Sequence, residues 1–246
     1  MKEVKAEETL KDHYAEFYSD SNSRLKEWRQ LSANAKSSNI VRHCSDLKHD
    51  VILDVGAGDG AVLRELSMNN FGTELHAVEL SESGVRAMKD QPFDRLASVQ
   101  EFDGYHLPFS DDQFDLAIMS HVLEHVEHPR VLLAEASRVS RHLFVEVPLE
   151  LTYRLPENFT WNSVGHINFY TAKSFRNLIQ SSSLDVICQE VTNASLDTHI
   201  FQSKKLGRLK YLIRQSLLRM APKLAPLFLV YHSCIVCKKT AVVEKS

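Results

Sequence analysis

The sequence predicts a doubly wound α/β fold, in which a mainly parallel sheet is covered by helices on both faces. One observation is the apolar run Val51–Val55, which leads directly into the glycine-rich turn Gly56-Ala57-Gly58-Asp59-Gly60. A second is the alternation of strand-like and helix-like segments from residue 51 to residue 148, which is typical of βαβ units. A third is that an acidic residue stands at or just after the end of each of the first three predicted strands. Ligands of such folds bind at the carboxyl ends of the strands.

Residues 1–46 are predicted to form a helical cover on the main domain, which spans residues 47–246. Lys and Glu are frequent in this segment, and Tyr14, Leu25 and Trp28 belong to a set of apolar and aromatic residues at helical spacings. One interpretation is an amphipathic cover packed on the core. The other is a lid over the ligand site with Tyr14 contacting the ligand, because aromatic residues with a polar group suit a site that closes.

The periodicity predicts the remaining elements in order. Within the core, residues 50–150, the expected strands are 51–55, 74–79, 97–102, 114–120 and 143–148, and the expected helices are 61–68, 81–89 and 129–140. Residues 149–170 then form a long aromatic loop, and long irregular segments in compact domains are usually functional. After it we expect a helix from the N-cap Thr171 to Ile179, a strand over 184–191, a basic helical insert over 203–223 and a last strand over 227–238.

The composition is that of an ordinary globular protein of 246 residues, with 43% hydrophobic residues and a formal net charge of −3. The charge is uneven, since residues 198–246 carry +9 and residues 1–197 carry −12. No apolar leader and no membrane-spanning apolar stretch occur in the sequence, so we expect a cytoplasmic protein. The four cysteines are too few and too dispersed for a disulfide framework.

The acids at the predicted strand ends favour a cationic ligand over a phosphate. Asp54 and Asp59 flank the first glycines, and Glu79 and Asp103 follow the next two strands. A phosphate at the start of a helix needs positive potential, which these carboxylates oppose. S-adenosylmethionine suits them better, because its ribose diol and adenine amino group need acceptors and its ammonium and sulfonium groups are cations.

The motifs resemble those of the class I S-adenosylmethionine-dependent methyltransferases, within the methyltransferase type 11 or ubiquinone-menaquinone methyltransferase-like group. They follow the family's order in Leu53-Asp54-Val55-Gly56-Ala57-Gly58-Asp59-Gly60, Val78-Glu79-Leu80-Ser81, Asp103-Gly104, Leu107-Pro108-Phe109, Phe114-Asp115-Leu116 and Ser120-His121-Val122-Leu123-Glu124-His125-Val126. The resemblance implies a Rossmann-like seven-stranded sheet of order 3-2-1-4-5-7-6 with an antiparallel last strand. It also implies S-adenosylmethionine as cofactor and S-adenosylhomocysteine as product.

The same resemblance implies roles for the cofactor-binding residues. The glycine turn is expected to hold the methionine part, the second motif the ribose hydroxyls, the third the adenine, and the end of the fourth strand the wall beside the sulfonium. In that order the residues are Gly56, Ala57 and Gly58; Glu79; Asp103 and Gly104; and the backbone of Ser120 and His121. Asp54 and Leu80 complete the expected cofactor-binding set.

Two histidines are the candidates for catalysis. His166 lies in the long loop, where an imidazole can orient an acceptor or take a proton near neutral pH, and His125 follows the fourth strand. In-line positioning alone can suffice for methyl transfer, so a base is not required.

The run from His121 to His125 also spells H-x-x-E-H, a zinc peptidase pattern when it lies in a helix. Because it directly follows a strand end beside the expected cofactor, we expect no metal here.

The acceptor is expected to be a small molecule or a lipid- or sugar-linked molecule, since the long aromatic loop offers it a surface. DNA and RNA are disfavoured, because no basic strip interleaved with aromatic residues is present, although the basic tail keeps them open. Two alternatives stand beside the methyltransferase: a non-catalytic S-adenosylmethionine-binding protein and a nicotinamide-dependent oxidoreductase. Binding of S-adenosylhomocysteine excludes the oxidoreductase, and turnover excludes the non-catalytic protein.

The segment 204–223 combines an apolar stripe with many cations. Four leucines, Ile213 and Met220 recur there at helical spacing among Lys and Arg residues. One interpretation is a helix that packs its stripe on the domain. The other is an interfacial helix that contacts an anionic membrane surface, or a lid over a negatively charged acceptor.

Overall fold

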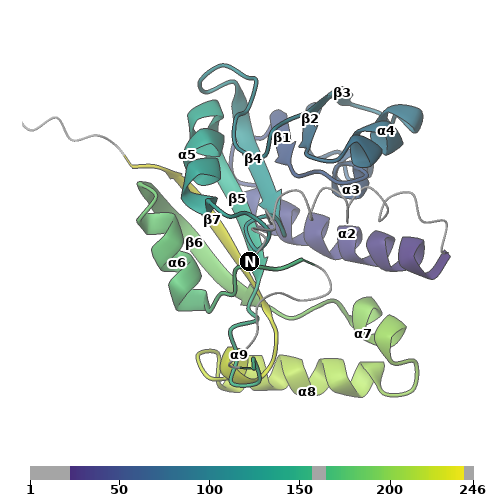
Figure 1. The fold of residues 1–246 in the computed structure, drawn as a ribbon. Coiled ribbons are helices and arrows are strands. Elements are labelled where there is room, and N and C mark those ends of the chain that lie inside the picture. Colours follow the sequence, from purple (N-terminus) through teal and green to yellow (C-terminus); the bar gives the residue numbers. More distant parts are fainter. Residues whose placement is uncertain (1–22, 157–164, 241–246) are drawn as a thin grey trace, which may run out of the picture.

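The computed structural model describes residues 23–156 and 165–240, and in this part of the chain seven strands form one sheet in the order β3-β2-β1-β4-β5-β7-β6 (Figure 1). The strands are β1 (Val51–Val55), β2 (Glu74–Glu79), β3 (Leu96–Glu101), β4 (Phe114–Ser120), β5 (Ser140–Pro148), β6 (Leu184–Thr192) and β7 (His232–Lys239). The helices are α2 (Ser23–Cys44), α3 (Ala61–Met68), α4 (Glu82–Asp90), α5 (Pro129–Val139), α6 (Ala172–Gln180), α7 (Leu196–Gln202), α8 (Gly207–Met220) and α9 (Ala225–Phe228). The predicted Rossmann-like fold and strand order are confirmed.

The sheet is parallel except at its last strand. β1 pairs in parallel with β2 and β4, β2 with β3, and β4 with β5, whereas β7 runs antiparallel to both β5 and β6. His232 at the start of β7 is therefore opposite Pro148 and Thr192, the last residues of β5 and β6. The carboxyl ends of the six parallel strands consequently lie along one edge of the sheet, where this class of fold binds its ligands.

The predicted boundaries agree well with the structure except near the C-terminus. Three predicted strands and the first core helix begin and end at the observed residues, and Thr171 caps α6 as expected. The predicted strand 227–238 is wrong at its start, because residues 225–228 form α9 and β7 begins at His232. A short apolar run fits a buried helix as well as a strand, and Pro226 in the first turn favours the helix.

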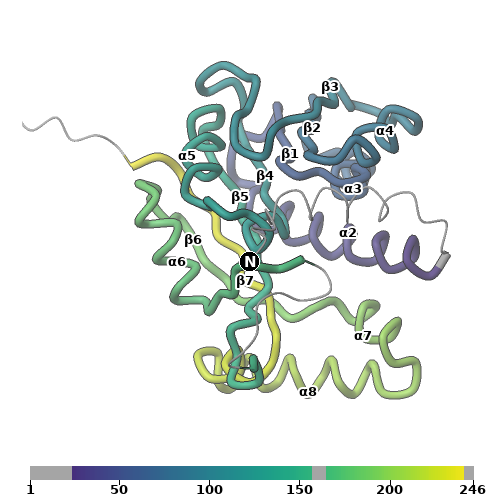
Figure 2. The backbone as a smooth tube through the Cα atoms, in the orientation of Figure 1, coloured from purple at the N-terminus to yellow at the C-terminus, as the bar shows by residue number. Residues whose placement is uncertain are grey.

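Helices cover both faces of the sheet, α5 and α6 on one face and α2, α3 and α4 on the other (Figure 1). Figure 2 shows the same arrangement of the backbone. The side chains of β4 alternate between the two cores: Ala117 and Met119 pack towards α5, and Leu116 and Ile118 pack towards α3. All four are fully buried, which explains the continuous apolar run Leu116–Met119 within this strand.

Helix α2 docks on α3 and on the glycine turn. The buried carboxylate of Glu65 in α3 accepts hydrogen bonds from the side-chain amides of Gln30 and Asn34 in α2. One residue before Gln30, Arg29 Nε of α2 lies 3.2 Å from Asp59 Oδ2 in the glycine turn. The helix is thus held by polar contacts at the side of the expected ligand site.

The face that α2 buries differs from the one that its apolar spacing predicts. Ala33, Ile40 and Cys44 are buried, while Trp28 is 37% exposed. Tyr14, the expected cofactor contact, lies outside the described residues.

The insert between β6 and β7 consists of α7, α8 and α9 and lies at the edge where the parallel strands end (Figure 1). The apolar stripe of its main helix, α8, is at the surface: the exposed fractions range from 41% to 84% for Leu206, Leu209, Leu212, Ile213, Leu217 and Met220. The interpretation that this stripe packs on the domain is therefore wrong. Among the helices of residues 23–156 and 165–240, none has the length and apolar character needed to cross a membrane.

Candidate functional site

The glycine turn between β1 and α3 comes close to the loop that follows β4. Gly56, Gly58 and Gly60 have φ values of +77°, +60° and +77°, which favour glycine. A Cβ atom on Gly56 would lie 2.9 Å from Val122 Cγ2, so a larger residue would collide with that loop. The Gly56 N–H also donates to Val78 O of β2 at 2.9 Å. The turn is therefore a narrow backbone cradle held against its neighbours.

The carboxylate of Glu79 joins the end of β2 to this cradle. It is buried, its Oε2 accepts from the Gly58 N–H at 2.9 Å, and its Oε1 accepts from the N–H and hydroxyl of Ser81 at 3.0 and 2.9 Å. The Ser81 hydroxyl in turn accepts from the Gly84 N–H and caps α4. A carboxylate has about four lone-pair sites, so Glu79 keeps capacity for a further donor such as a ribose hydroxyl.

Asp103 and Gly104 follow β3 on the rim of the same crevice. The Asp103 carboxylate accepts from the N–H groups of His106 and Tyr105 at 2.7 and 2.8 Å and lies 2.7 Å from His106 Nδ1. These contacts, led by the His106 N–H, lower the pKa of Asp103 to about 2. A Cβ on Gly104 would lie 3.7 Å from Leu80 Cδ1, so two of the residues expected to bind the cofactor lie close together.

Asp54 at the end of β1 is buried beside the cradle. Burial raises the pKa of Asp54 to about 7; the charge of Lys36 opposes this shift and that of Glu79 adds to it. The charge of Asp54 therefore changes near neutral pH. A cationic ligand beside it would favour the ionised form.

Ser120 and His121 end β4 and face β5. The Ser120 hydroxyl donates to Glu146 Oε2 at 2.8 Å, and the His121 N–H donates to Glu146 O at 2.9 Å. His121 has φ +61°, which is uncommon for a residue with a side chain and is often found at functional sites. Burial lowers the pKa of His121 well below its usual value, so its imidazole is neutral at physiological pH.

The two predicted catalytic histidines lie together at this edge. The rings of His125 and His166 are 4.7 Å apart in an edge-to-face arrangement. His125 Nδ1 lies 3.1 Å from Gly165 O, and His166 Nδ1 lies 2.6 Å from Glu150 Oε2. Burial lowers the pKa of His125. Three segments that are distant in the sequence therefore converge on this histidine pair.

Backbone contacts fix the segment 165–170 to the loop after β4. The Asn168 N–H donates to Glu124 O at 3.0 Å, and the Tyr170 hydroxyl donates to Leu123 O at 3.2 Å. Tyr170 is buried, so the expectation that it offers a surface to the acceptor is wrong. Tyr153, from the other end of the predicted loop, is 78% exposed and remains available to one.

Sequence reasoning missed several titratable residues of this site: Glu124, Glu146, Glu150 and His232. Glu124 and Glu146 are almost completely buried, and the ring of His232 lies 4.9 Å from that of His121. Glu124 was visible in the H-x-x-E-H pattern, but residues 121–128 form a loop and not the helix that the peptidase pattern requires. Glu146 and His232 meet because β7 inserts beside β5, and Glu150 meets His166 across a long connection; no local signal in the sequence predicts either contact.

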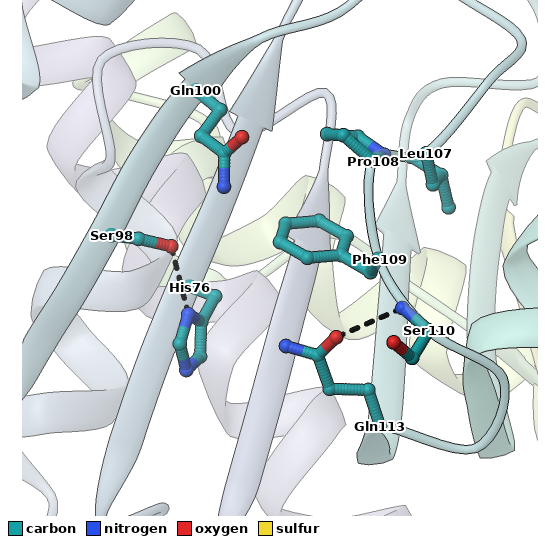
Figure 3. Close-up of a pocket in the computed structure, with 8 residues that line it drawn as sticks. All are labelled: His76, Ser98, Gln100, Leu107, Pro108, Phe109, Ser110 and Gln113. Atoms are coloured by element: carbon teal, nitrogen blue, oxygen red, sulfur yellow. Dashed lines mark hydrogen bonds between the residues drawn. The ribbon is translucent and has the colours of Figure 1, made fainter.

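A pocket of about 650 Å³ lies elsewhere, over the middle of β2 and β3 (Figure 3). His76 and Ser98 form its strand side, with a hydrogen bond of 2.8 Å between them, and the connection containing Phe109 and Gln113 forms the other side. None of its lining residues is a predicted cofactor or catalytic residue. We therefore do not assign the cofactor to it.

Comparison with known proteins identifies one family. The methyltransferase domain family matches residues 12–189. An "Uncharacterized methyltransferase" of Mycobacterium avium (strain 104) is 36% identical over 93 residues, which are 37% of this chain and 35% of that protein. The "Probable tocopherol O-methyltransferase, chloroplastic" of Oryza sativa subsp. japonica is 31% identical over 100 residues, which are 39% of this chain and 27% of that protein. The chain thus spans about a third of the length of these curated relatives.

Solved structures share the fold over most of the chain. Geranyl diphosphate C-methyltransferase from Streptomyces coelicolor A3(2), solved with Mg²⁺, geranyl diphosphate and S-adenosylhomocysteine, has a TM-score of 0.64 at 13% identity and covers 97% of this chain and 99% of its own. The cyclase SpnF has a TM-score of 0.59 at 16% identity and covers 85% of this chain and 82% of its own. At these identities the likeness establishes the fold alone, and the reaction has to be argued from the site.

The chain belongs to the methyltransferase domain family. Its strand order and the sequence of its motifs are those of the class I S-adenosylmethionine-dependent methyltransferases, and S-adenosylmethionine is the cofactor of that class.

Replacing Glu79 by Ala is expected to weaken S-adenosylhomocysteine binding by about 1.5–3 kcal/mol, which is roughly 10- to 150-fold in Kd. The change removes the expected ribose acceptor and also frees the Gly58 N–H. Calorimetry measures the effect, and Glu82→Ala, which removes an exposed acid of α4, is the matched control. Unchanged affinity in Glu79→Ala would contradict the assignment.

The affinity for S-adenosylmethionine is expected to fall as the pH is lowered through about 7, the raised pKa of Asp54. Above this pH the carboxylate is charged and attracts the cationic ligand, and below it the neutral acid does not. Calorimetric titrations on both sides of this pH, with Asp54→Asn as the comparison, measure the effect. The variant should bind weakly with little pH dependence, and an equally steep dependence in the variant would assign the titration to another group.

Proposed function

We propose that the chain transfers the methyl group of S-adenosylmethionine to a small-molecule or lipid- or sugar-linked acceptor. The observation that carries this proposal is the buried Glu79 carboxylate, which holds the glycine cradle and keeps acceptor capacity at the end of β2. The order of motifs in the matched family supports it. Asp54 and Asp103, at neighbouring strand ends, add the negative charge that a cationic cofactor needs.

The chain's own residues provide positioning and proton handling for this reaction. S-adenosylmethionine supplies an activated methyl group, which an acceptor atom takes in line as sulfur keeps the electrons of the broken bond. Glu79 orients the donor, and the backbone of Ser120 and His121 lies at the expected sulfonium wall. His166, oriented by Glu150 at 2.6 Å, stands on the acceptor side, where its imidazole can hold the acceptor or receive its proton.

The alternatives fit the geometry less well. A nicotinamide cofactor would bring its pyrophosphate to a turn flanked by Asp54 and Asp59, where the charge is unfavourable. A protein that binds the cofactor without methyl transfer has the same cradle, and the cyclase SpnF shows that this fold occurs in proteins named for other reactions. The histidine pair on the acceptor side favours an enzyme, because a binding protein has no need of it.

Mass spectrometry of cell extracts tests the proposal. The protein is incubated with the extract and with S-adenosylmethionine that carries an isotope-labelled methyl group. The expected result is a labelled small molecule or lipid that is absent when the Glu79→Ala variant replaces the wild type. Extracts of several growth conditions in which no labelled product forms, although the cofactor binds, would favour the non-catalytic alternative.

Replacing His166 by Ala is expected to lower kcat by roughly 10²–10⁴-fold while the affinity for S-adenosylhomocysteine stays within about twofold. The reason is that His166 lies with His125 on the acceptor side and not at the glycine cradle. Single-turnover kinetics and calorimetry measure the two quantities, and His128→Ala, an exposed histidine on the loop after β4, is the control. If both quantities stay at wild-type values, His166 has only a structural role.

We also propose that α8 contacts an anionic membrane surface, which would bring a lipid-linked acceptor to the site. Its apolar stripe is exposed, and the segment 204–223 carries seven Lys and Arg and no acid. Such a helix gains from burying its apolar side chains among lipid headgroups and from attraction to anionic lipids. A cytoplasmic location stays a prediction from the sequence and is compatible with this contact.

Sedimentation with liposomes is expected to show binding to vesicles that contain phosphatidylserine but not to neutral phosphatidylcholine vesicles. The bound fraction should fall as salt rises, because salt screens the attraction. Leu212→Glu, at a position that is 60% exposed, should abolish binding without affecting the fold. Equal and negligible binding to both kinds of vesicle at low salt would rule out the membrane contact and leave the interpretation of α8 as a lid.

A further inference from the structure

Glu124 is the most unusual side chain on the acceptor side. It is fully buried, and neither carboxylate oxygen has a hydrogen-bond partner within the described chain. His121 Nδ1 lies 3.1 Å from Oε1 but outside hydrogen-bonding geometry. Burial of an unpaired carboxylate is costly, so such a group is either protonated or paired with a cation.

The two imidazoles grouped with this carboxylate each have Nδ1 engaged by another oxygen atom. His125 Nδ1 is engaged by Gly165 O and His166 Nδ1 by the Glu150 carboxylate, at 3.1 and 2.6 Å. Donation from Nδ1 leaves the lone pair on Nε2, and this second contact to a carbonyl or carboxylate is the usual support of a metal-binding histidine. The two rings therefore have the tautomer that a metal site requires.

The distances are those of a site that can close around an ion. One carboxylate oxygen of Glu124 and one ring nitrogen each of His125 and His166 lie within 4.8 Å of one another. Donor atoms of a tetrahedral zinc site with bonds of about 2.0–2.1 Å are separated by about 3.3 Å, so the side chains need to move inwards by little more than about 1 Å. Two imidazoles and one carboxylate also leave a coordination position open, as catalytic zinc sites do.

We propose that Glu124, His125 and His166 bind one divalent transition-metal ion, with Zn²⁺ as the expected ion. Two of the three donors are imidazoles, which select zinc and its transition-metal neighbours over Mg²⁺ and Ca²⁺. The ligands come from the loop after β4 and from the segment 165–170, so the site differs from the helical H-x-x-E-H arrangement. This proposal departs from the sequence-based expectation that no metal binds here.

A second group of possible ligands, His121, Glu146 and His232, also lies within 4.8 Å but is explained without an ion. Glu146 already accepts from the Ser120 hydroxyl at 2.8 Å and from the Asn39 side-chain amide at 2.8 Å. Its carboxylate is therefore satisfied by the protein. The contrast with Glu124, whose oxygens have no such donors, selects the first group as the metal site.

The consequence for catalysis rests on the proposed methyl transfer, whereas ion binding does not. With the ion bound, its open coordination position would hold the oxygen of an acceptor hydroxyl and lower the pKa of that hydroxyl. The proton passes to water, the oxygen forms a bond to the methyl carbon, and the sulfur keeps the electron pair of the broken bond as the product thioether. His125 and His166 then act through the ion and not as the proton acceptor.

Calorimetric titration of the chelator-treated full chain with ZnCl₂ tests the site, together with the metal content of the untreated protein by mass spectrometry. One Zn²⁺ per chain is expected, with affinity reduced by at least about tenfold in Glu124→Gln. Zinc should also raise the Tm of the wild type but not that of Glu124→Gln. This variant removes only a buried charge and should fold in the absence of metal at least as stably as the wild type.

Two control variants separate this site from other zinc-binding histidines. His128→Gln, on the same loop but exposed, and His232→Gln, in the second group, should keep wild-type affinity. No zinc binding by the wild type, equal binding by Glu124→Gln, or loss of binding in His232→Gln alone would overturn the proposal. S-adenosylhomocysteine binding by the metal-free protein is measured in parallel, so that failure of the metal site and failure of the methyltransferase assignment are distinguished.

Discussion

The carboxylate of Glu79 accepts hydrogen bonds from the Gly58 N–H and from Ser81, and the crevice at the strand ends depends on these contacts. They fix the glycine cradle, the end of β2 and the start of α4 in one arrangement. Because Glu79 is buried, a charge there has to be held by such donors. The carboxylate that shapes the crevice is thus already oriented for a ligand, which lowers the free-energy cost of binding.

Four buried acids lie at this edge of the sheet, and the protein accommodates them in two different ways. Glu79 and Glu146 are satisfied by hydrogen-bond donors of the protein. Asp54 has its pKa raised to about 7 by burial, and burial also raises the pKa of Glu124. The two acids with raised pKa values lie where a cationic ligand and a metal ion are proposed.

The fold was predictable because its signals are local or ordered along the chain. The run Val51–Val55 and its glycine turn, and the acids after β2 and β3, could be placed from the sequence, and the structure brings the turn, Glu79, Leu80 and Gly104 together. The proximity of His125 and His166 was not predicted, because the sequence placed His125 after the fourth strand and His166 in the long loop without relating the two.

Other features depend on contacts that the sequence does not encode locally. His232 reaches His121 because β7 inserts next to β5, and Glu150 reaches His166 from the other end of a long connection. Helical periodicity predicts that α8 has an apolar stripe but not whether the stripe finds a partner, and here it stays exposed. The start of the last strand was misplaced for a similar reason, because an apolar run fits a helix and a strand alike.

The most direct test of the central claim is a calorimetric titration of the wild-type chain with S-adenosylhomocysteine and, in a parallel experiment, with NADH. If the carboxylates at the strand ends form the site of an S-adenosylmethionine-dependent enzyme, S-adenosylhomocysteine binds with one molecule per chain and NADH gives no heat of binding at the same concentrations. Saturable NADH binding without S-adenosylhomocysteine binding would contradict the account.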